Sequence, residues 1–210
     1  PRQGSMPIGH EPAGEVVEVG ADVTGIAVGD RVVVNPMAVA DDIIGNGGST
    51  GALADYLLIK DAVRGRSVEV VPDHIPYQVA ALNEPMAVAR HAVNQVAPRQ
   101  GDRVLVFGAG PIGLGITIAL KSRGVKHVAV ADILPERLDK ALSVGADAVI
   151  NSKDEDLTTR LIELHGDGDS MWPNRAGTDI FLDAAGVPAV VDTALGVAKR
   201  GATLGIVAVH

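Results

Sequence analysis

The feature that most constrains this chain is a regular alternation of short apolar runs and helical stretches in its second half. Apolar runs at 103–107, 127–131, 148–150, 179–183 and 203–209 alternate with helical stretches at 110–123, 135–144 and 190–198. Strands and helices in this order form a parallel sheet with right-handed crossovers. We therefore expect an α/β fold with a doubly wound parallel sheet, of which five strands are present and the commonly found sixth is missing.

The first part of the chain has a different pattern. Residues 12–70 contain short alternating segments at 13–20, 30–34 and 52–59, separated by glycine-rich turns, which predict a small β-barrel or sandwich, or part of one. Residues 76–96 have the apolar spacing of a helix, and Pro98 ends it. We therefore expect three parts, with boundaries at 1–75, 76–97 and 98–210.

Composition and charge exclude several classes of protein. The net charge is −8, and an acidic surface repels both nucleic acid and anionic membranes. The uncharged run 104–120 contains glycines and Pro111 and is shorter than the roughly 20 apolar residues of a membrane helix. The chain has no cysteine, which excludes disulfides and thiolate ligands within it and fits a cytoplasmic location. We expect neither nucleic acid nor a membrane as partner.

The strongest local motif follows the apolar run at 103–107. Gly108 permits a tight turn, Gly110 lets the backbone approach a pyrophosphate, and Gly113 lets helix and strand pack closely. The anion would lie on the amides at the start of the helix, beside Pro111 and Ile112. Asp132 ends the next apolar run at about the spacing expected for the acid that binds the adenosine ribose, which favours NAD over NADP. Arg137 is a complication because its cation would weaken the repulsion of a 2′-phosphate.

Two further groups of residues could bind a metal. His10 and Glu11 precede the first alternating segment, and both are good Zn²⁺ ligands, although such a dipeptide is more often a surface pair. Glu84 lies in a mostly apolar helical stretch, where a carboxylate is costly unless it is paired or metal-bound. The alternative is a glutamate that caps the helix or faces solvent. Among the other histidines, we expect His127 and His165 to be solvated and His91 to pack within the helix.

Taken together, these elements resemble the zinc-dependent medium-chain dehydrogenase/reductase family, most closely the sorbitol, idonate and threonine dehydrogenase branch of the alcohol dehydrogenases. The resemblance rests on Gly9-His-Glu-Pro-Ala-Gly-Glu-Val-Val-Glu-Val-Gly20, Val28-Gly-Asp-Arg-Val32, Ala54-Asp-Tyr56, Glu84-Pro85, the glycine motif and Ala141-x-x-x-Gly-Ala-Asp147. It implies a GroES-like β-barrel that carries a catalytic zinc and a Rossmann domain that carries the nicotinamide cofactor. It also implies that the chain is an internal fragment of a protein of roughly 340 residues.

The resemblance also implies roles for individual residues. His10 would be a zinc ligand, Glu11 a ligand or its immediate neighbour, and Glu84 the carboxylate near the metal that holds water or the substrate hydroxyl. The cofactor would contact positions matching Ile112, Asp132 and Arg137, and the end of the fifth strand at Val207, Ala208 and Val209.

The sequence departs from the family in its metal ligands. The family's first zinc ligand is a cysteine upstream of the Gly-His-Glu element, and its four-cysteine structural zinc lobe is replaced here by the loop 35–51. We therefore expect no structural zinc, and a catalytic site limited to His10, Glu11, Glu84 and water, which suits zinc less well than a thiolate site.

The function we predict is zinc-assisted, NAD-dependent oxidation of a secondary alcohol of a polyol or sugar acid, by a homo-oligomer that is a dimer or a tetramer. Two alternatives remain. One is a catalytically incomplete NAD-binding module, and the other is a zinc-free quinone reductase of the same superfamily. His10, Glu11 and Glu84 argue against the reductase, because an enzyme without a metal needs none of them.

Overall fold

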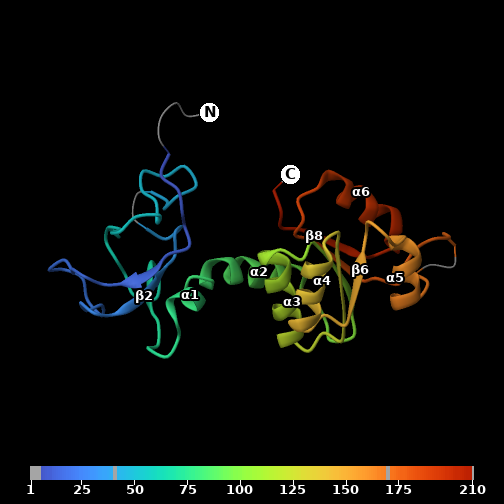
Figure 1. Cartoon of the computed structure of the whole chain (residues 1–210), viewed down its shortest axis with the longest axis horizontal. Helices are drawn as coiled ribbons and strands as arrows, with labels where there is room; N and C mark the ends of the chain where they lie inside the picture. Colours follow the sequence, from blue (N-terminus) through green and yellow to red (C-terminus); the bar gives the residue numbers. More distant parts are fainter. Residues whose placement is uncertain (1–5, 40–41, 169–170, 210) are drawn as a thin grey trace. The chain divides into compact units, whose positions relative to one another are not determined.

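The computed structural model describes residues 6–39, 42–168 and 171–209. The chain divides into two compact units, Pro1–Glu84 and Pro85–His210, which we call unit 1 and unit 2 (Figure 1). The boundary between them lies within the segment 76–97 that we predict to be the connection.

Unit 1 contains a small antiparallel sheet. Strands β1 (Ala13–Glu15), β2 (Arg31–Val34) and β3 (Val68–Val70) pair in the order β1-β2-β3. Val33 on the central strand packs with Val71 and Ala80, the last of which lies on the short helix α1 (Tyr77–Ala80). Arg31 connects strand to helix, because its guanidinium donates to the carbonyl oxygens of Asp73 and Ile75 and lies over the Tyr77 ring.

Two of the strands predicted for unit 1 differ from the structure. The prediction of a strand at 52–59 is wrong: Leu53 and Tyr56 are 75% and 78% exposed, so no apolar layer covers one face of the segment. The backbone amides of Ala52 and Leu53 bond instead to the carbonyl oxygens of Gly9 and Ile8. Within the predicted strand 13–20, only β1 is a strand. One more residue, Val16, pairs beyond it: its amide donates to the Asp30 carbonyl oxygen, and its carbonyl oxygen accepts the Gly29 amide.

Unit 2 is a doubly wound parallel sheet, as predicted. The strands are β4 (Arg103–Phe107), β5 (His127–Asp132), β6 (Ala148–Asn151), β7 (Ile180–Asp183) and β8 (Thr203–Ile206), in the order β6-β5-β4-β7-β8. The helices are α3 (Pro111–Ser122), α4 (Pro135–Ser143), α5 (Leu157–His165) and α6 (Pro188–Val197), together with α2 (Asn83–Val96), whose first two residues belong to unit 1 and whose remainder belongs to unit 2. The predicted single helix at 76–96 is divided into α1 and α2 by a turn at 81–82.

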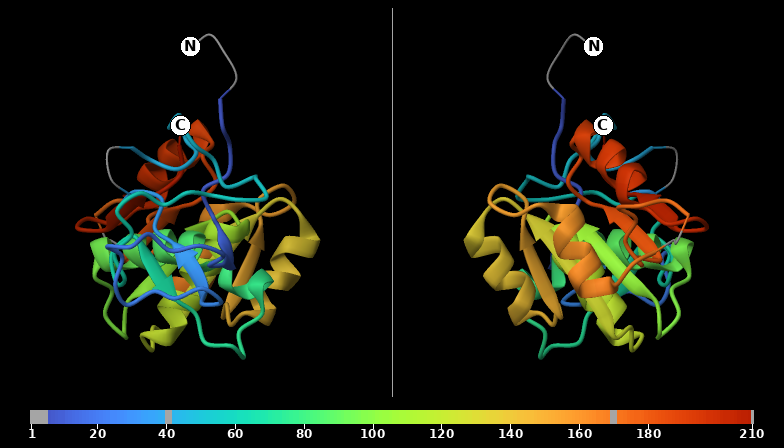
Figure 2. Two further views of the ribbon diagram at one scale, coloured as in Figure 1. Left: turned by 90° about the vertical axis from the view of Figure 1, so that its left-hand side faces the viewer. Right: turned by 90° about the vertical axis from the view of Figure 1, so that its right-hand side faces the viewer.

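Helices cover both faces of this sheet (Figure 2). Side chains alternate between the faces of a strand, so Val104 and Val106 of β4 pack with α2, α3 and α4, whereas Leu105 and Phe107 pack with α5 and α6. Phe107 also stacks on Phe181 of β7 across the second face. These strands are buried on both sides, which explains why their sequences are continuously apolar rather than alternating.

Three details of unit 2 correct the sequence-based expectations. Strand β8 ends at Ile206, so 207–209 are not part of the fifth strand: the amides of Val207 and Ala208 both donate to the Asp183 carbonyl oxygen, which takes the chain out of the ladder. His165 is buried and its Nδ1 lies 2.8 Å from Thr178 Oγ1, so it is not solvated. His91, predicted to pack within its helix, is exposed.

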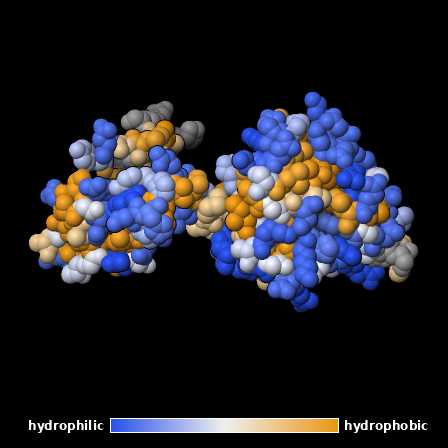
Figure 3. All heavy atoms as spheres, turned by 60° about the horizontal axis from the view of Figure 1, so that its bottom comes forward, coloured by the Kyte–Doolittle hydropathy of each residue, from blue (hydrophilic) through white to orange (hydrophobic). Residues whose placement is uncertain are grey.

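Among the residues that the structure describes, no helix combines the length and the apolar character that crossing a bilayer would require. Apolar side chains are nevertheless visible at the surface of each unit (Figure 3).

Candidate functional site

Three potential metal ligands come together in unit 1. One ligand atom each from His10, Glu11 and Glu84 lies within 4.8 Å of the other two, and His10 Nε2 is 3.9 Å from Glu84 Oε2. Donors around a tetrahedral zinc with bonds of about 2.0–2.2 Å stand roughly 3.3–3.6 Å apart. The donor atoms here stand somewhat farther apart, within 4.8 Å of one another, and a nitrogen with two carboxylate oxygens is a suitable donor set. The three residues therefore fit a divalent metal such as zinc.

The ligands reach this position from two places in the sequence. His10 and Glu11 lie just before β1, and Glu84 lies in the first turn of α2. The side chains of His10 and Glu84 are 32% and 22% exposed, so the pair is partly shielded from water while remaining accessible.

The electrostatics of Glu84 reflect this environment. Burial raises the pKa of the Glu84 carboxyl above its usual value, because a shielded carboxylate loses hydration. The positive charge that His10 can carry lowers this pKa, and the nearby Glu11 carboxylate raises it. Two carboxylates close together favour a bound cation, since the cation offsets their mutual repulsion.

The glycine motif in unit 2 forms a tight turn between β4 and α3. Gly108 has φ +90°, and a Cβ there would lie 3.1 Å from the backbone of Ala184. A Cβ on Gly113 would lie 1.8 Å from the Gly108 carbonyl oxygen. Both positions therefore require glycine, for the turn and for the packing of α3 against the end of β4.

Gly110 differs from its two neighbours in the motif. It is the N-cap of α3, its φ is −76°, and a Cβ there would meet no atom within 4 Å. Its glycine is thus not required by the fold of the chain itself, but it leaves space in front of the helix. The first amides of a helix have no partner within the helix, and the first turn of α3 carries no acidic residue. The turn is therefore suited to an anionic group such as a pyrophosphate.

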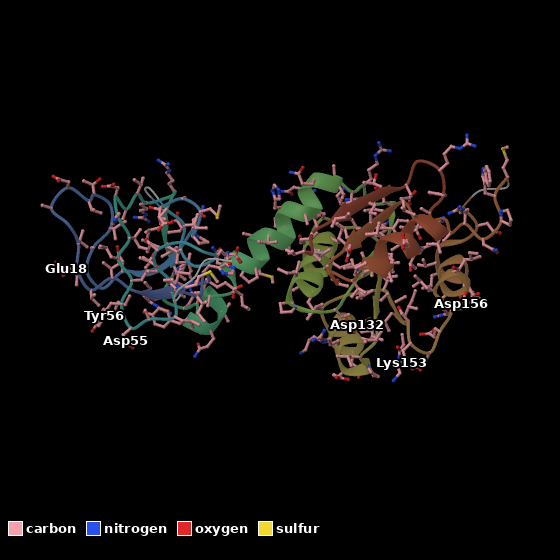
Figure 4. The ribbon with its side chains drawn as sticks, turned by 90° about the horizontal axis from the view of Figure 1, so that it is seen from above. Glu18, Asp55, Tyr56, Asp132, Lys153 and Asp156 are labelled. Carbon is pink, nitrogen blue, oxygen red and sulfur yellow. The ribbon has the colours of Figure 1, made fainter. Side chains whose placement is uncertain are left out.

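Asp132 lies at the end of β5, beside this turn (Figure 4). Its Oδ2 accepts the Ala109 amide at 2.7 Å, and its Oδ1 accepts the amides of Ile133 and Leu134 at 2.7 and 3.0 Å. The Asp132 side chain is only 7% exposed, whereas Arg137, whose guanidinium lies 4.0 Å from it, is 52% exposed. The carboxylate thus stabilises the glycine turn itself, and the role in binding ribose predicted for it, like that of Arg137, stays a prediction.

The segment after β8 lies next to the end of β7. A Cβ on Gly186 would lie 2.9 Å from the Val209 carbonyl oxygen and 3.2 Å from Ala208 Cβ. Val207 also lines a groove of about 310 Å³ in unit 2, together with residues of α2, β7 and β8: Val88, His91, Ala92, Gln95, Val96, Leu182, Gly205 and Ile206. Gly108 and 207–209 therefore both lie against the loop 184–186 that follows β7.

The sequence analysis missed two groups of residues that position the site. Asp183 is fully buried and its Oδ1 accepts the amides of Ala185 and Gly186, which shapes the loop facing Gly108. Gly45 and Gly51 lie against the backbone of Gly9 and Ile8. The high glycine content of 45–51 could have indicated the contacts of Gly45 and Gly51, but we interpreted this loop only as the replacement of a zinc lobe.

Comparisons with protein families match both parts of the chain. The model described as "Alcohol dehydrogenase GroES-like domain" matches residues 1–68, and the model described as "Zinc-binding dehydrogenase" matches residues 111–210. The two matches agree with the predicted order of a GroES-like part followed by a Rossmann-type sheet.

Comparisons with individual proteins point in the same direction. The chain is 34% identical over 200 residues to (R,R)-butanediol dehydrogenase of Bacillus subtilis, covering 90% of this chain and 54% of that protein. It is 31% identical over 216 residues to sorbitol dehydrogenase of the same organism, covering 95% and 58%. A solved structure named as a short chain alcohol dehydrogenase of Escherichia coli, complexed with NADH, has a TM-score of 0.79 at 29% identity, covering 95% of this chain and 60% of that chain. The chain therefore spans a little over half the length of these relatives.

Proposed function

Since the chain belongs to the zinc-binding alcohol dehydrogenases of the medium-chain dehydrogenase/reductase family, we propose that the protein oxidises an alcohol with a nicotinamide dinucleotide as hydride acceptor. In this reaction a secondary alcohol loses a proton from oxygen and a hydride from carbon, and leaves as a ketone while NAD⁺ becomes NADH. A bound divalent metal and a bound dinucleotide would supply the Lewis acid and the hydride acceptor.

The observation that carries the proposal is the convergence of His10, Glu11 and Glu84 in unit 1. In the proposed reaction these three residues hold the metal. The Glu84 side chain, which is less exposed than that of His10, also orients the hydroxyl group of the substrate. A dinucleotide-binding module alone would need only the glycine turn and not this cluster. The metal cluster therefore distinguishes an enzyme from a binding module.

The glycine turn supports the choice of cofactor. Gly110 leaves open space at the start of α3, and we assign the pyrophosphate to the amides there, beside Pro111, Ile112 and Gly113. Asp132 and Arg137 border this position, and the segment 207–209 lies against the loop that packs on Gly108. We propose NAD rather than NADP, because the carboxylate of Asp132 would repel a 2′-phosphate.

A polyol or a sugar acid is our proposal for the substrate class. Curated relatives include proteins named as sorbitol and (R,R)-butanediol dehydrogenases, and a solved structure named as L-idonate 5-dehydrogenase has a TM-score of 0.72 at 26% identity.

We also propose a homo-oligomer, since β8 is an edge strand of its sheet and Ile206 on it is 55% exposed.

The test of the metal claim is the amount of Zn²⁺ retained by the chain after dialysis, measured by atomic absorption. We expect about one Zn²⁺ per chain, and a loss of at least tenfold in affinity for His10→Ala and Glu84→Gln. His127→Ala is the matched control, because His127 is exposed and belongs to β5 in unit 2. Absence of zinc from the wild-type chain, combined with NADH binding in a fluorescence titration, would leave the NAD-binding module as the better description.

A further inference from the structure

The backbone just before His10 pairs with a glycine-rich loop. Residues 44–53, which we call the His10 loop, bond to the segment 8–10 through two backbone hydrogen bonds: the Ala52 amide donates to the Gly9 carbonyl oxygen at 2.9 Å, and the Leu53 amide donates to the Ile8 carbonyl oxygen at 3.1 Å. These bonds replace the strand pairing predicted for 52–59. The His10 loop therefore has a specific backbone partner, and that partner carries the first candidate metal ligand.

The contact leaves no room for side chains at three glycines. A Cβ on Gly45 would lie 2.5 Å from the Gly9 carbonyl oxygen and 3.3 Å from His10 Cβ. A Cβ on Gly51 would lie 2.4 Å from the Ile8 carbonyl oxygen. Gly9 itself has φ +88°, and a Cβ there would lie 2.8 Å from the Leu53 amide nitrogen. Any side chain larger than hydrogen would push the segment 8–10 away.

The His10 loop is itself held in shape. The Gly45 amide donates to the Thr50 carbonyl oxygen at 2.7 Å, and Ile44 beside it is 1% exposed. The Asp42 carboxylate accepts the amides of Ile43 and Ser49 at 2.8 and 2.7 Å and also bonds the Ser49 hydroxyl. A loop closed in this way can resist movement of the segment that packs on it.

From these contacts we infer that the His10 loop is a positioning element for the metal site, in which Gly45 and Gly51 hold the His10 imidazole against Glu84. The inference rests on the proposed function, because it concerns the same metal ligands. It assigns a role to Gly45 and Gly51 that depends on backbone contact and not on chemistry of their own. Ligands held in place before the metal arrives lose less freedom on binding, so disturbing the groups that orient them weakens the site.

The variants that test this are Gly45→Ala and Gly51→Ala, with Gly29→Ala as the matched control. Gly29 lies in the same unit and has φ +91°, but a Cβ there would meet nothing within 4 Å. Gly45 has φ +64°, so alanine is strained at both positions, but only the Gly45 substitution also adds a contact with the segment that carries His10. Gly51→Ala has the steric clash without the backbone strain, because the φ of Gly51 lies outside the left-handed region.

The measurements are Co²⁺ affinity, followed by the visible absorption of the bound ion, and the urea midpoint of unfolding for each variant. We expect Gly45→Ala and Gly51→Ala to bind Co²⁺ at least tenfold more weakly than wild type, while Gly29→Ala lowers the urea midpoint but keeps the wild-type affinity. Wild-type affinity in Gly45→Ala and Gly51→Ala would overturn the inference and leave the proposed function standing. Equal weakening in Gly29→Ala would also overturn it.

If the wild-type chain binds no Co²⁺, the metal part of the proposed function fails, and the positioning role is then decided by crystal structures of the same proteins. The inference expects the His10 imidazole to leave Glu84 in Gly45→Ala and Gly51→Ala, and to remain near the wild-type 3.9 Å in Gly29→Ala. An unchanged distance in all three variants would overturn it.

Discussion

Asp132 accepts three backbone amides with a side chain that is almost completely covered. The sequence did not predict these hydrogen bonds, because the spacing from Gly108 indicates only a carboxylate that binds the ribose of a dinucleotide. In the structure the same carboxylate connects the end of β5 to the glycine turn through Ala109. The residue therefore has a structural role whether or not it also contacts a ligand.

Asp132→Asn separates these two roles. An asparagine has the same shape but only one acceptor oxygen, so at least one backbone amide loses its partner, which costs about 1–3 kcal/mol. Loss of the negative charge also removes the repulsion of a 2′-phosphate, so the preference for NADH over NADPH should narrow. Fluorescence titrations with both cofactors and urea denaturation measure the two effects.

Asp139→Asn is the control for this variant, because it removes the same charge from an exposed position on α4. It should leave both the stability and the cofactor preference unchanged. An unaltered preference in Asp132→Asn would remove Asp132 from the cofactor site and leave it a structural residue.

At the scale of elements, the turn from β4 to α3 contains two glycines that the fold requires, Gly108 and Gly113, and one that it does not, Gly110. Gly113→Ala places a Cβ 1.8 Å from the Gly108 carbonyl oxygen, so we expect a loss of about 1–3 kcal/mol or more from the forced separation of strand and helix. Gly110→Val adds a Cβ that meets no atom within 4 Å and loses only the N-cap preference for glycine over valine, about 1 kcal/mol, so its urea midpoint should fall less than that of Gly113→Ala. It should nevertheless bind NADH at least tenfold more weakly, because the valine fills the position of the pyrophosphate.

Gly196→Ala serves as the reference for this pair, since Gly196 lies on α6 and a Cβ there also meets nothing within 4 Å. It should retain NADH affinity and gain slightly in stability, as alanine does in a helix. NADH affinity of Gly110→Val equal to that of Gly196→Ala would contradict our placement of the cofactor.

Elements with strong local signals were predicted closely. Strand β4 begins and ends where the apolar run does, and α3 and α4 begin at Pro111 and Pro135, within one residue of the predicted starts. Proline at the first helical position acts within one turn, so the local sequence contains the information. The strand predicted at 52–59 failed because a strand needs a partner, which periodicity does not identify.

For the whole molecule, the pH dependence of stability should reflect a buried histidine. Burial lowers the pKa of His165 to about 4, since an imidazolium there would lose its hydration; the charges of Arg103, His127 and Lys199 act in the same direction, and that of Asp179 opposes them. In the unfolded chain the histidine takes up a proton near pH 6.5. The contribution of neutral His165 to the free energy of unfolding is therefore complete above about pH 6.5 and is lost as the pH falls towards 4.

We expect up to about 3 kcal/mol of unfolding free energy to be lost across this range. His165→Asn keeps a polar group near Thr178 but does not titrate, so its urea midpoint should change less between pH 7 and pH 5. His74→Asn, at an exposed position in unit 1, should keep the wild-type dependence. A wild-type slope in His165→Asn would show that other groups carry the pH dependence.

The sequence by itself determined the parallel sheet, the glycine turn and the place of Asp132 next to it, because strand length, helix caps and the spacing of one strand–helix–strand unit are local properties. The family resemblance already implied a common site for His10, Glu11 and Glu84, and the tertiary structure added the spacing of their ligand atoms. Only the tertiary structure decided that the loop 44–53 packs on the backbone of Gly9, that β8 ends before Val207 and that His165 is buried. Each of these depends on which distant backbone or side chain occupies the neighbouring space, and that is set by the packing of the folded chain.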